Sequence, residues 1–349
     1  MDTQAVLNGL IEKKDLDRGE AEALMGSIMS GELSAVRAAA ILTALRMKGE
    51  TIDEITGFVS AMREKVIPVS PQREGLIDTC GTGGDSRHTF NISTATAFVA
   101  AGMGIGVAKH GNRAVSSRCG STDVLDALEV NLDLGPDAVA VLIDRVGLGF
   151  LFAPHHHPAM KHIAPVRREL GTRTVFNLLG PMTNPAGVKR QLIGVFRRDL
   201  TEVVARVLQA LGSEKVFVVH GLDGTDEVSL SGETAVSLLE DGSVKTMTFV
   251  PEDAGVERAD ISALGGGDAG ENAAHLVEVL RGTKGPRRDA VVLNAAFAAV
   301  VADKAPNLAE GAGLARDTID SGAALDRLEA LRRESHALAN GGPTRGSSG

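Results

Sequence analysis

A glycine-rich segment at residues 81–85 is the first place where this chain could do chemistry. It reads Gly-Thr-Gly-Gly-Asp and follows the short apolar run at residues 76–77. Glycines permit positive φ, and successive N–H groups in such a segment form a concave site for anions. The segment predicts either a phosphate-binding loop or an ordinary turn. It is not a Walker A loop, because no Lys-Ser/Thr pair follows. Asp85 would suit a ribose hydroxyl or a cation better than a bare phosphate.

Two further polar stretches follow in the chain. Residues 91–94 read Asn-Ile-Ser-Thr and open an apolar helical run to Met103. The positive end of that helix would attract an anion, and Asn91 or Ser93 could equally cap it. Residues 109–117 read Lys-His-Gly-Asn-Arg-Ala-Val-Ser-Ser after an apolar strand. They form either a solvated loop or a basic one, in which Lys and Arg would neutralise a pyrophosphate.

Three later groups could complete a site. His155, His156 and His157 are adjacent, so a shared metal ion is less suitable for them than a place in a substrate pocket. Arg167 and Arg168 could clamp a carboxylate or face solvent. The turn at residues 224–227 ends in Asp-Glu. It could bind Mg²⁺ together with substrate phosphates, or it could be an acidic surface turn.

The first 66 residues predict a unit of four helices. Residues 17–20 and 51–54 have capping-box spacing, and Gly31 and Gly49 could end helices. The segment at residues 67–71 reads Ile-Pro-Val-Ser-Pro, which suits an extended linker and a hinge.

From residue 76 onward strands and helices alternate, which predicts an α/β domain with a central, largely parallel sheet. Pro165 should kink or end its helix. The expected strands are residues 76–78, 104–108, 149–152, 172–175, 191–195, 216–220, 235–239 and 243–248. The expected helices are residues 93–103, 121–130, 136–146, 159–170, 200–211, 272–280, 289–302, 307–321 and 323–340.

Composition narrows the class of protein. The 349 residues are 43% hydrophobic and carry a net charge of −9, with neither Trp nor Tyr. This disfavours nucleic-acid binding, which usually needs a basic face and aromatic stacking. Cys80 and Cys119 are expected to be reduced thiols. Residues 1–12 lack a signal-peptide pattern, and no apolar run reaches about 18 residues. We therefore expect a cytoplasmic protein without a membrane partner.

Taken together and in this order, these stretches resemble the anthranilate phosphoribosyltransferase family of tryptophan biosynthesis. The resemblance spans about residues 3 to 340. It is carried by Gly81–Asp85, Asn91–Thr94, Lys109–Ser117, the His-Pro-Ala-Met run at 157–160, Arg167, the Asn-Leu-Leu-Gly-Pro-Met-Thr-Asn-Pro run at 177–185, and Asp226-Glu227.

The resemblance implies a fold with two domains. A helical domain at residues 1–66, joined by part of residues 165–190, would be hinged at residues 67–75 to an α/β phosphoribosyltransferase domain at residues 76–340. Residues 341–349 would form a flexible tail. Family members usually form homodimers through the helical domain, so we expect a homodimer.

The resemblance also implies a reaction. The enzyme, a glycosyltransferase, would transfer the 5-phosphoribosyl group from phosphoribosyl pyrophosphate to the amine of anthranilate, releasing pyrophosphate. Lys109, His110 and Arg167 would be the catalytic residues. Phosphoribosyl pyrophosphate would be held by Gly81, Gly84, Asp85, Thr89, Asn91, Ile92, Ser93, Thr94, Lys109, His110, Gly111, Asn112, Arg113, Ala114, Val115, Ser116, Ser117 and Ser121. Anthranilate would contact Gly81, His110, Asn112, His157 and Arg167. Two Mg²⁺ ions would be bound through Ser93, Asp226 and Glu227.

Two alternatives remain on the sequence alone. A pyrimidine-nucleoside phosphorylase of the same architecture would use phosphate as its nucleophile, and residues 81–85 disfavour it. A non-catalytic, nucleic-acid-binding relative would expect a basic groove and eroded metal ligands. The net charge of −9 and the intact Asp226-Glu227 pair disfavour that relative.

Overall fold

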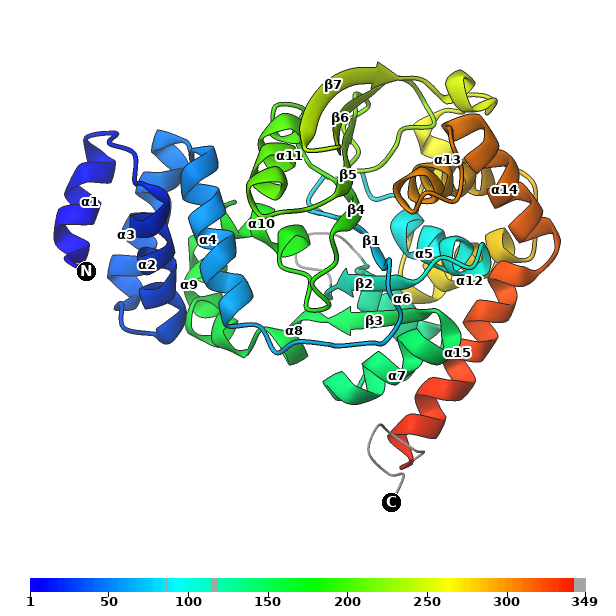
Figure 1. Ribbon diagram of the computed structural model, residues 1–349, viewed down its shortest axis with the longest axis horizontal. Helices are drawn as coiled ribbons and strands as arrows, with labels where there is room; N and C mark the ends of the chain where they lie inside the picture. Colours follow the sequence, from blue (N-terminus) through cyan, green and yellow to red (C-terminus); the bar gives the residue numbers. More distant parts are fainter. Residues whose placement is uncertain (86, 114–118, 342–349) are drawn as a thin grey trace.

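The computed structural model describes residues 1–85, 87–113 and 119–341 (Figure 1). The chain begins with four helices, α1 (Thr3–Ile11), α2 (Arg18–Ser30), α3 (Ala35–Lys48) and α4 (Ile52–Glu64). The predicted capping boxes form at Asp17/Glu20 and Thr51/Glu54. The predicted helix ends at Gly31 and Gly49 are also observed, each with a positive φ.

Seven strands form one sheet in the order β3-β2-β1-β4-β5-β6-β7. The strands are β1 (Ile77–Gly81), β2 (Val107–Gly111), β3 (Leu148–Phe152), β4 (Arg190–Gly194), β5 (Lys215–Gly221), β6 (Thr234–Glu240) and β7 (Ser243–Phe249). The first five strands in this order are mutually parallel. Strand β6 pairs antiparallel with β5, and β7 pairs antiparallel with β6. The chain winds outward in one direction from β1 and in the other from β4. In such sheets a ligand crevice lies beyond the carboxyl ends of the two strands at this switch point.

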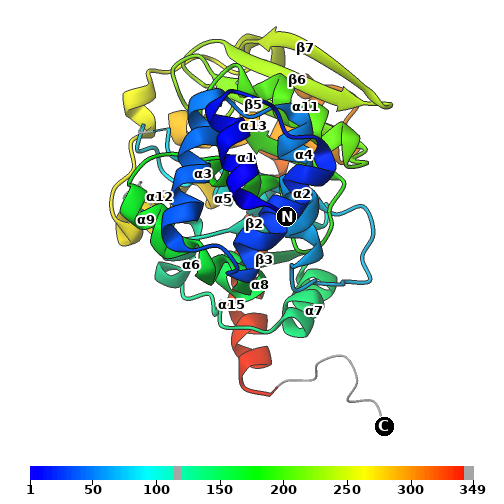
Figure 2. The same cartoon turned by 90° about the vertical axis from the view of Figure 1, so that its left-hand side faces the viewer.

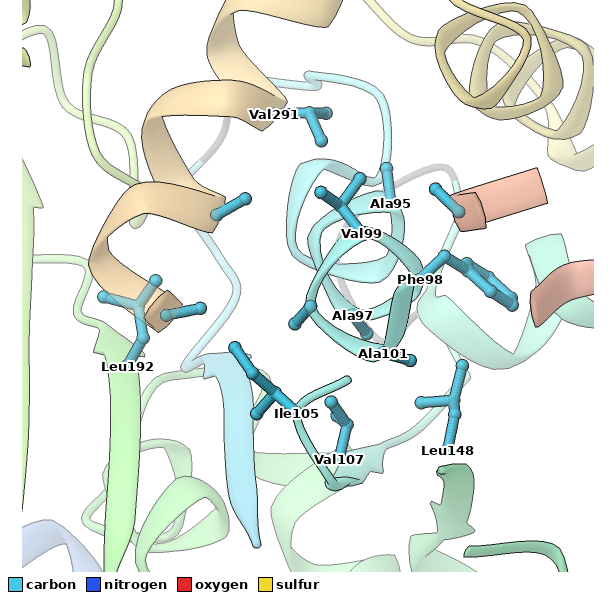
Figure 3. Close-up of a cluster of buried hydrophobic side chains, with 14 of the residues drawn as sticks. Ala95, Ala97, Phe98, Val99, Ala101, Ile105, Val107, Leu148, Leu192 and Val291 are labelled. Carbon is cyan, nitrogen blue, oxygen red and sulfur yellow. The ribbon is translucent and has the colours of Figure 1, made fainter. Parts of the chain in front are cut away.

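Helix α5 (Ile92–Gly102) lies at the centre of the larger core. Its apolar side chains, among them Phe98 and Val99, are fully buried, because the helix packs against both the sheet and other helices. Figure 3 shows α5 surrounded by Val107, Leu148, Leu192 and Val291. The remaining helices are α6 (Ser121–Ala127), α7 (Pro136–Val146), α8 (Ala153–His156), α9 (Ala164–Leu170), α10 (Phe176–Leu179), α11 (Leu200–Ala210), α12 (Ala269–Leu280), α13 (Pro286–Val301), α14 (Leu308–Asp320) and α15 (Ala323–Ala339).

A second core joins the N-terminal helices to the larger domain. In Figure 2 the four N-terminal helices lie in front of the sheet, and α4 packs against α11. Val166 of α9 and Phe176 of α10 belong to the same apolar cluster as Leu24 and Phe58 of the bundle. Residues of the 163–182 segment therefore pack with the helical bundle. The domain limits and the hinge given above stay predictions.

Three sequence-based assignments need correction. Residues 172–175 do not form a strand: they connect α9 to α10, and Val175 is buried in the bundle-side cluster. The helix expected at residues 159–170 is interrupted, because proline suits only the first turn of a helix. A short 3-10 helix (Pro158–His162) precedes α9, and Pro165 lies in the first turn of α9. The third correction concerns β1 and β2: β1 extends to Gly81, and β2 covers residues 107–111 instead of 104–108. The predicted flexible tail lies outside the described residues, apart from Gly341.

Candidate functional site

Two carboxylates bridge the glycine segment and the start of α5. Asp226 and Glu227 lie in the turn that follows β5. Asp226 Oδ2 accepts a hydrogen bond of 2.6 Å from the Gly83 N–H. Glu227 Oε1 accepts one of 3.1 Å from the Ser93 N–H. Elements separated by about 140 residues thus meet at the carboxyl end of the sheet, where β1 and β4 adjoin.

Two glycines at the ends of β1 and β4 make this approach possible. A Cβ on Gly194 would lie 1.5 Å from the Asp226 carbonyl oxygen, and one on Gly81 would lie 2.4 Å from Asp226 Oδ2. Gly81 is therefore needed for contact within the protein, not only for contact with a ligand. Gly83 and Gly84 have φ values of 67° and 75°, so they form the left-handed part of the segment, as the sequence predicted.

The environment of the two carboxylates resists negative charge. Burial and, to a smaller extent, the neighbouring Asp85 together raise the pKa of Asp226 to about 6. Burial and the adjacent Asp226 raise the pKa of Glu227 to about 8. A bound cation would reverse both effects by stabilising the anions. In the parts of the chain that are described, no group of three or more His, Cys, Asp or Glu side chains could hold a metal ion. Two carboxylates alone fit Mg²⁺, which completes its coordination with water and substrate phosphates.

Lys109 supplies positive charge close to Asp226 and Glu227. Its side chain is only 2% exposed, and its Nζ donates to the Thr79 carbonyl and to Ser93 Oγ, the latter at 3.3 Å. The sequence placed Lys109 in a loop, but it lies inside β2. Among the described residues Lys109 forms no ion pair, although its charge lowers the pKa of both Asp226 and Glu227. A buried ammonium without a carboxylate partner suits an anionic ligand.

His110 and His157 form a buried pair. His110 Nδ1 lies 3.1 Å from the Gly180 carbonyl oxygen, and the two Nε2 atoms are 3.2 Å apart. Burial lowers the pKa of His110 to about 3 and that of His157 to about 4, so both rings are neutral at pH 7. Since a carbonyl can only accept, His110 carries its proton on Nδ1 and accepts from His157 Nε2. His157 Nδ1 is then a buried acceptor without a partner in the described part of the chain.

Arg167 packs against the first residue of α10. Its guanidinium carbon is 5.2 Å from the centre of the Phe176 ring, and burial lowers its pKa. Helix α10 links Arg167 to the histidine pair, since Phe176 begins it and Gly180 follows it. The structure therefore brings His110 and His157 together, and the helix that carries Arg167 packs against the 3-10 helix that begins directly after His157.

Other residues assigned to phosphoribosyl pyrophosphate lie in the first turn of α5 or just before it. Thr89 forms a β-bridge with Gly265. Ile92 and Thr94 are buried, and Thr94 Oγ1 has no partner among the described residues. Asn91 is the N-cap residue of α5, as one of the two sequence-based choices predicted, but among the described residues its side chain makes no capping hydrogen bond. Its Oδ1 instead accepts from Asn272 at 3.0 Å.

The segment after β2 leads toward α6. Asn112 accepts from Ser121 Oγ at 3.3 Å through its carbonyl oxygen, and Gly111 faces the same hydroxyl closely. Arg113 pairs with Asp123 at 3.1 Å and Asp126 at 2.8 Å, so acidic residues of α6 already partner its charge. The residues Ala114, Val115, Ser116 and Ser117 lie outside the described residues. Asp85 accepts from the Arg87 N–H at 3.2 Å.

Sequence reasoning missed several residues that hold the site. Arg173 donates to the Gly84 carbonyl, and its guanidinium lies 4.5 Å from the centre of the Phe196 ring. No local pattern marks Arg173, because its partners are distant in the sequence. Asp223 accepts 2.6 Å hydrogen bonds from the hydroxyls of Ser229 and Ser231, which shapes the acidic turn. Its position three residues before Asp226 could have drawn attention to it.

A helical bundle joined to a doubly wound sheet, with paired carboxylates at the switch point, defines the class of this protein. Residues 4–66 match the model described as "Glycosyl transferase family, helical bundle domain". Residues 73–325 match the model described as "Glycosyl transferase family, a/b domain". The fold is therefore that of this two-domain group of glycosyl transferases.

Comparison with individual proteins narrows the class to one family. The anthranilate phosphoribosyltransferase of Moorella thermoacetica is 53% identical over 94% of this chain and 97% of its own. The enzyme of Symbiobacterium thermophilum is 53% identical over 96% of this chain and 98% of its own. The crystal structure of the Thermus thermophilus enzyme matches with a TM-score of 0.91 and 46% identity, over 97% of this chain and 100% of that one. The chain belongs to the anthranilate phosphoribosyltransferase family.

A more distant structure comes from Saccharomyces cerevisiae. This anthranilate phosphoribosyltransferase, "in complex with PRPP and Mg", matches with a TM-score of 0.87 and 29% identity, over 96% of this chain and 99% of that one. Another structure of the yeast enzyme is "in complex with 4-fluoroanthranilate". In the described part of the present chain, no helix has the length and apolar character needed to cross a membrane.

Proposed function

We propose that this chain transfers the 5-phosphoribosyl group from phosphoribosyl pyrophosphate to the amine of anthranilate, giving N-(5-phosphoribosyl)anthranilate and pyrophosphate in tryptophan biosynthesis. One observation carries the proposal: Asp226 and Glu227 tie the glycine segment to the first turn of α5 at the switch point of the sheet. Relatives that are about 50% identical to this chain over almost its whole length are named anthranilate phosphoribosyltransferase, the enzyme of this reaction.

Phosphoribosyl pyrophosphate would occupy the crevice beyond β1 and β2. The backbone of the glycine segment, the first turn of α5, and the residues that follow β2 would hold its phosphates and ribose. Lys109 is the cationic residue best suited to the pyrophosphate, because it is buried and has no carboxylate partner in the described chain. It would stabilise negative charge as the pyrophosphate departs.

Asp226 and Glu227 would bind Mg²⁺, with Ser93 beside them. The raised pKa values of both carboxylates support this assignment, because a cation would favour their ionised forms. Mg²⁺ bound there would supply positive charge to the pyrophosphate leaving group. We expect two ions to accompany the substrate.

Anthranilate would lie near the neutral histidine pair, with Arg167 holding its carboxylate. An aryl amine is already neutral at pH 7, so the protein has mainly to position it. His157 Nδ1, which has no partner among the residues that the structure describes, could accept a hydrogen bond from that amine. Arg167 lies on the bundle-side segment, so closure about residues 67–71 would bring it toward the ribose and exclude water.

We also expect a homodimer formed through the helical bundle. Ile11, Val36 and Met47 of this bundle are 65%, 81% and 80% exposed, a degree of exposure that a second copy would reduce. A cytoplasmic location stays a prediction from the sequence.

A fluorescence assay tests the proposed function. Anthranilate fluorescence should fall when the protein, Mg²⁺ and phosphoribosyl pyrophosphate are mixed, and omission of any one of the three should prevent the decrease. A stable signal would contradict the proposal. Phosphorolysis of pyrimidine nucleosides, or binding of a nucleic acid in its place, would support one of the two alternatives.

A further inference from the structure

A buried amide on α12 contacts the residue that precedes α5. Asn272 is only 2% exposed. Its Oδ1 accepts a hydrogen bond of 2.8 Å from the Gly267 N–H, and its Nδ2 donates one of 3.0 Å to Asn91 Oδ1. Asn272 is not among the substrate-binding residues assigned above, yet it touches one of them.

These contacts fix the orientation of both amides. The Gly267 N–H can only donate, so the oxygen of Asn272 must face it. The NH₂ group of Asn272 must then face Asn91, and it can only donate. Asn91 therefore has to present its own oxygen to Asn272, and in the described part of the chain its NH₂ group donates to no other residue, so it is available to a ligand. The lack of a capping bond from Asn91 to α5 agrees with this arrangement, because its oxygen is already engaged.

Asn272 also lies near the end of the segment that follows β2. Burial raises the pKa of the Cys119 thiol, and the nearby Asn272 amide offsets part of that shift. Cys119 lies two residues before Ser121. The helix that carries Asn272, α12, packs against both α5 and α6, the helices that follow the two segments assigned to phosphoribosyl pyrophosphate.

We propose that Asn272 is a positioning residue, which holds the Asn91 amide so that its NH₂ group, and not its oxygen, faces phosphoribosyl pyrophosphate. The proposal rests on the proposed function, since it takes that substrate as the ligand. A phosphate or pyrophosphate oxygen accepts hydrogen bonds, so an NH₂ group attracts it and a carbonyl oxygen repels it. Reversal of one amide would therefore weaken substrate binding without removing any contact atom from the site.

The Asn272→Asp substitution tests this directly. At pH 8 one oxygen of the new carboxylate still accepts from Gly267, while the other repels Asn91 Oδ1 and turns that amide over. If the productive orientation falls to about a tenth of the population or less, the apparent Kd for phosphoribosyl pyrophosphate rises about tenfold or more. Protonation at lower pH lets the carboxyl donate to Asn91 again, so the ratio of variant to wild-type Kd should fall toward one as the pH is lowered to 5.5.

Asn272→Ala is the matched control at the same position. It removes the donor without adding an acceptor, so Asn91 can present either end and the Kd should rise only about twofold at both pH values. Titration calorimetry with phosphoribosyl pyrophosphate and Mg²⁺ measures all these constants without turnover. Thermal unfolding of each variant shows whether it is folded.

The proposal is overturned if folded Asn272→Asp binds as wild type does at pH 8, or if its loss of affinity is the same at pH 5.5. Asn91→Asp gives an independent test should Asn272→Asp fail to fold. The carboxylate at position 91 can still accept from Asn272 but turns its second oxygen to the substrate, so a rise in Kd of about tenfold or more is expected. Wild-type affinity of Asn91→Asp would also refute the proposal. Binding by the wild type without loss of anthranilate fluorescence would contradict the proposed acceptor alone.

Discussion

The contact between Gly194 and the acidic turn gives a prediction whose size follows from the structure. In Gly194→Ala the new Cβ would lie 1.5 Å from the Asp226 carbonyl oxygen, whereas real Cβ contacts stay beyond 3.0 Å. The turn must therefore move by at least about 1.5 Å. A displacement of that size breaks the 2.6 Å bond from Gly83 to Asp226 and shifts both carboxylates. Since a misplacement of about 1 Å can cost about 100-fold in rate, we expect kcat/KM to fall at least that much.

The fluorescence assay, run across a series of Mg²⁺ concentrations, measures this loss. Gly81→Ala should lose less activity, because its Cβ meets the end of the Asp226 side chain, at 2.4 Å, and that side chain can rotate. Gly135→Ala is the matched control: its φ is −69°, and no atom of the described residues lies within 4 Å of its Cβ position. A folded Gly194→Ala protein with wild-type kcat/KM and Mg²⁺ dependence would refute the placement of the acidic turn.

Three further predictions test other parts of the site. Arg167→Ala should raise KM for anthranilate about tenfold or more and leave KM for phosphoribosyl pyrophosphate nearly unchanged, and equal effects in steady-state kinetics would count against its role. Replacement of Asp226 and Glu227 by Ala should reduce activity and Mg²⁺ dependence together by about 100-fold or more, so full activity at the same Mg²⁺ concentration would remove them from the site. Without Mg²⁺, the pKa of Glu227 in the folded state is raised to about 8, so the folded state binds more protons than the unfolded state. Tm should therefore fall as the pH rises from about 6.5 to about 8. Mg²⁺ should raise Tm more at the higher pH than at the lower one, and calorimetry of Glu227→Gln should show neither effect.

Most of the fold follows from local signals in the sequence. The helix starts at Asp17 and Thr51 depend on side chains three residues away, and both capping boxes form. The expected strand at residues 172–175 failed because a short run rich in β-branched residues, Thr-Arg-Thr-Val, does not reveal its partners. Val175 is buried against the helical bundle and not in the sheet. Pro165 marked a real interruption, but whether it would kink one helix or begin a new one depended on tertiary packing.

The sequence predicted which types of residue form the site better than it predicted the contacts that hold them in place. The sequence singled out the glycine segment, Lys109 and the Asp226-Glu227 pair as chemically suitable. It could not show that Gly81 is required by Asp226, or that Lys109 is buried inside a strand, because both facts depend on contacts across the sheet. Arg173 and Asn272 carry no local signal, since their hydrogen bonds join segments about 90 and 180 residues apart.

The first turn of α5 connects the apolar core to the residues of the candidate site. Glu227 accepts from the Ser93 N–H, Lys109 contacts the Ser93 hydroxyl, and Asn272 holds Asn91. The remainder of α5 is buried among apolar side chains (Figure 3), so these three contacts start from a fixed element. A site built on such an element is pre-organised for its substrate. Arg167 belongs instead to the segment packed with the helical bundle. Closure about residues 67–71 would then move the acceptor-binding side while the phosphoribosyl pyrophosphate side keeps its geometry.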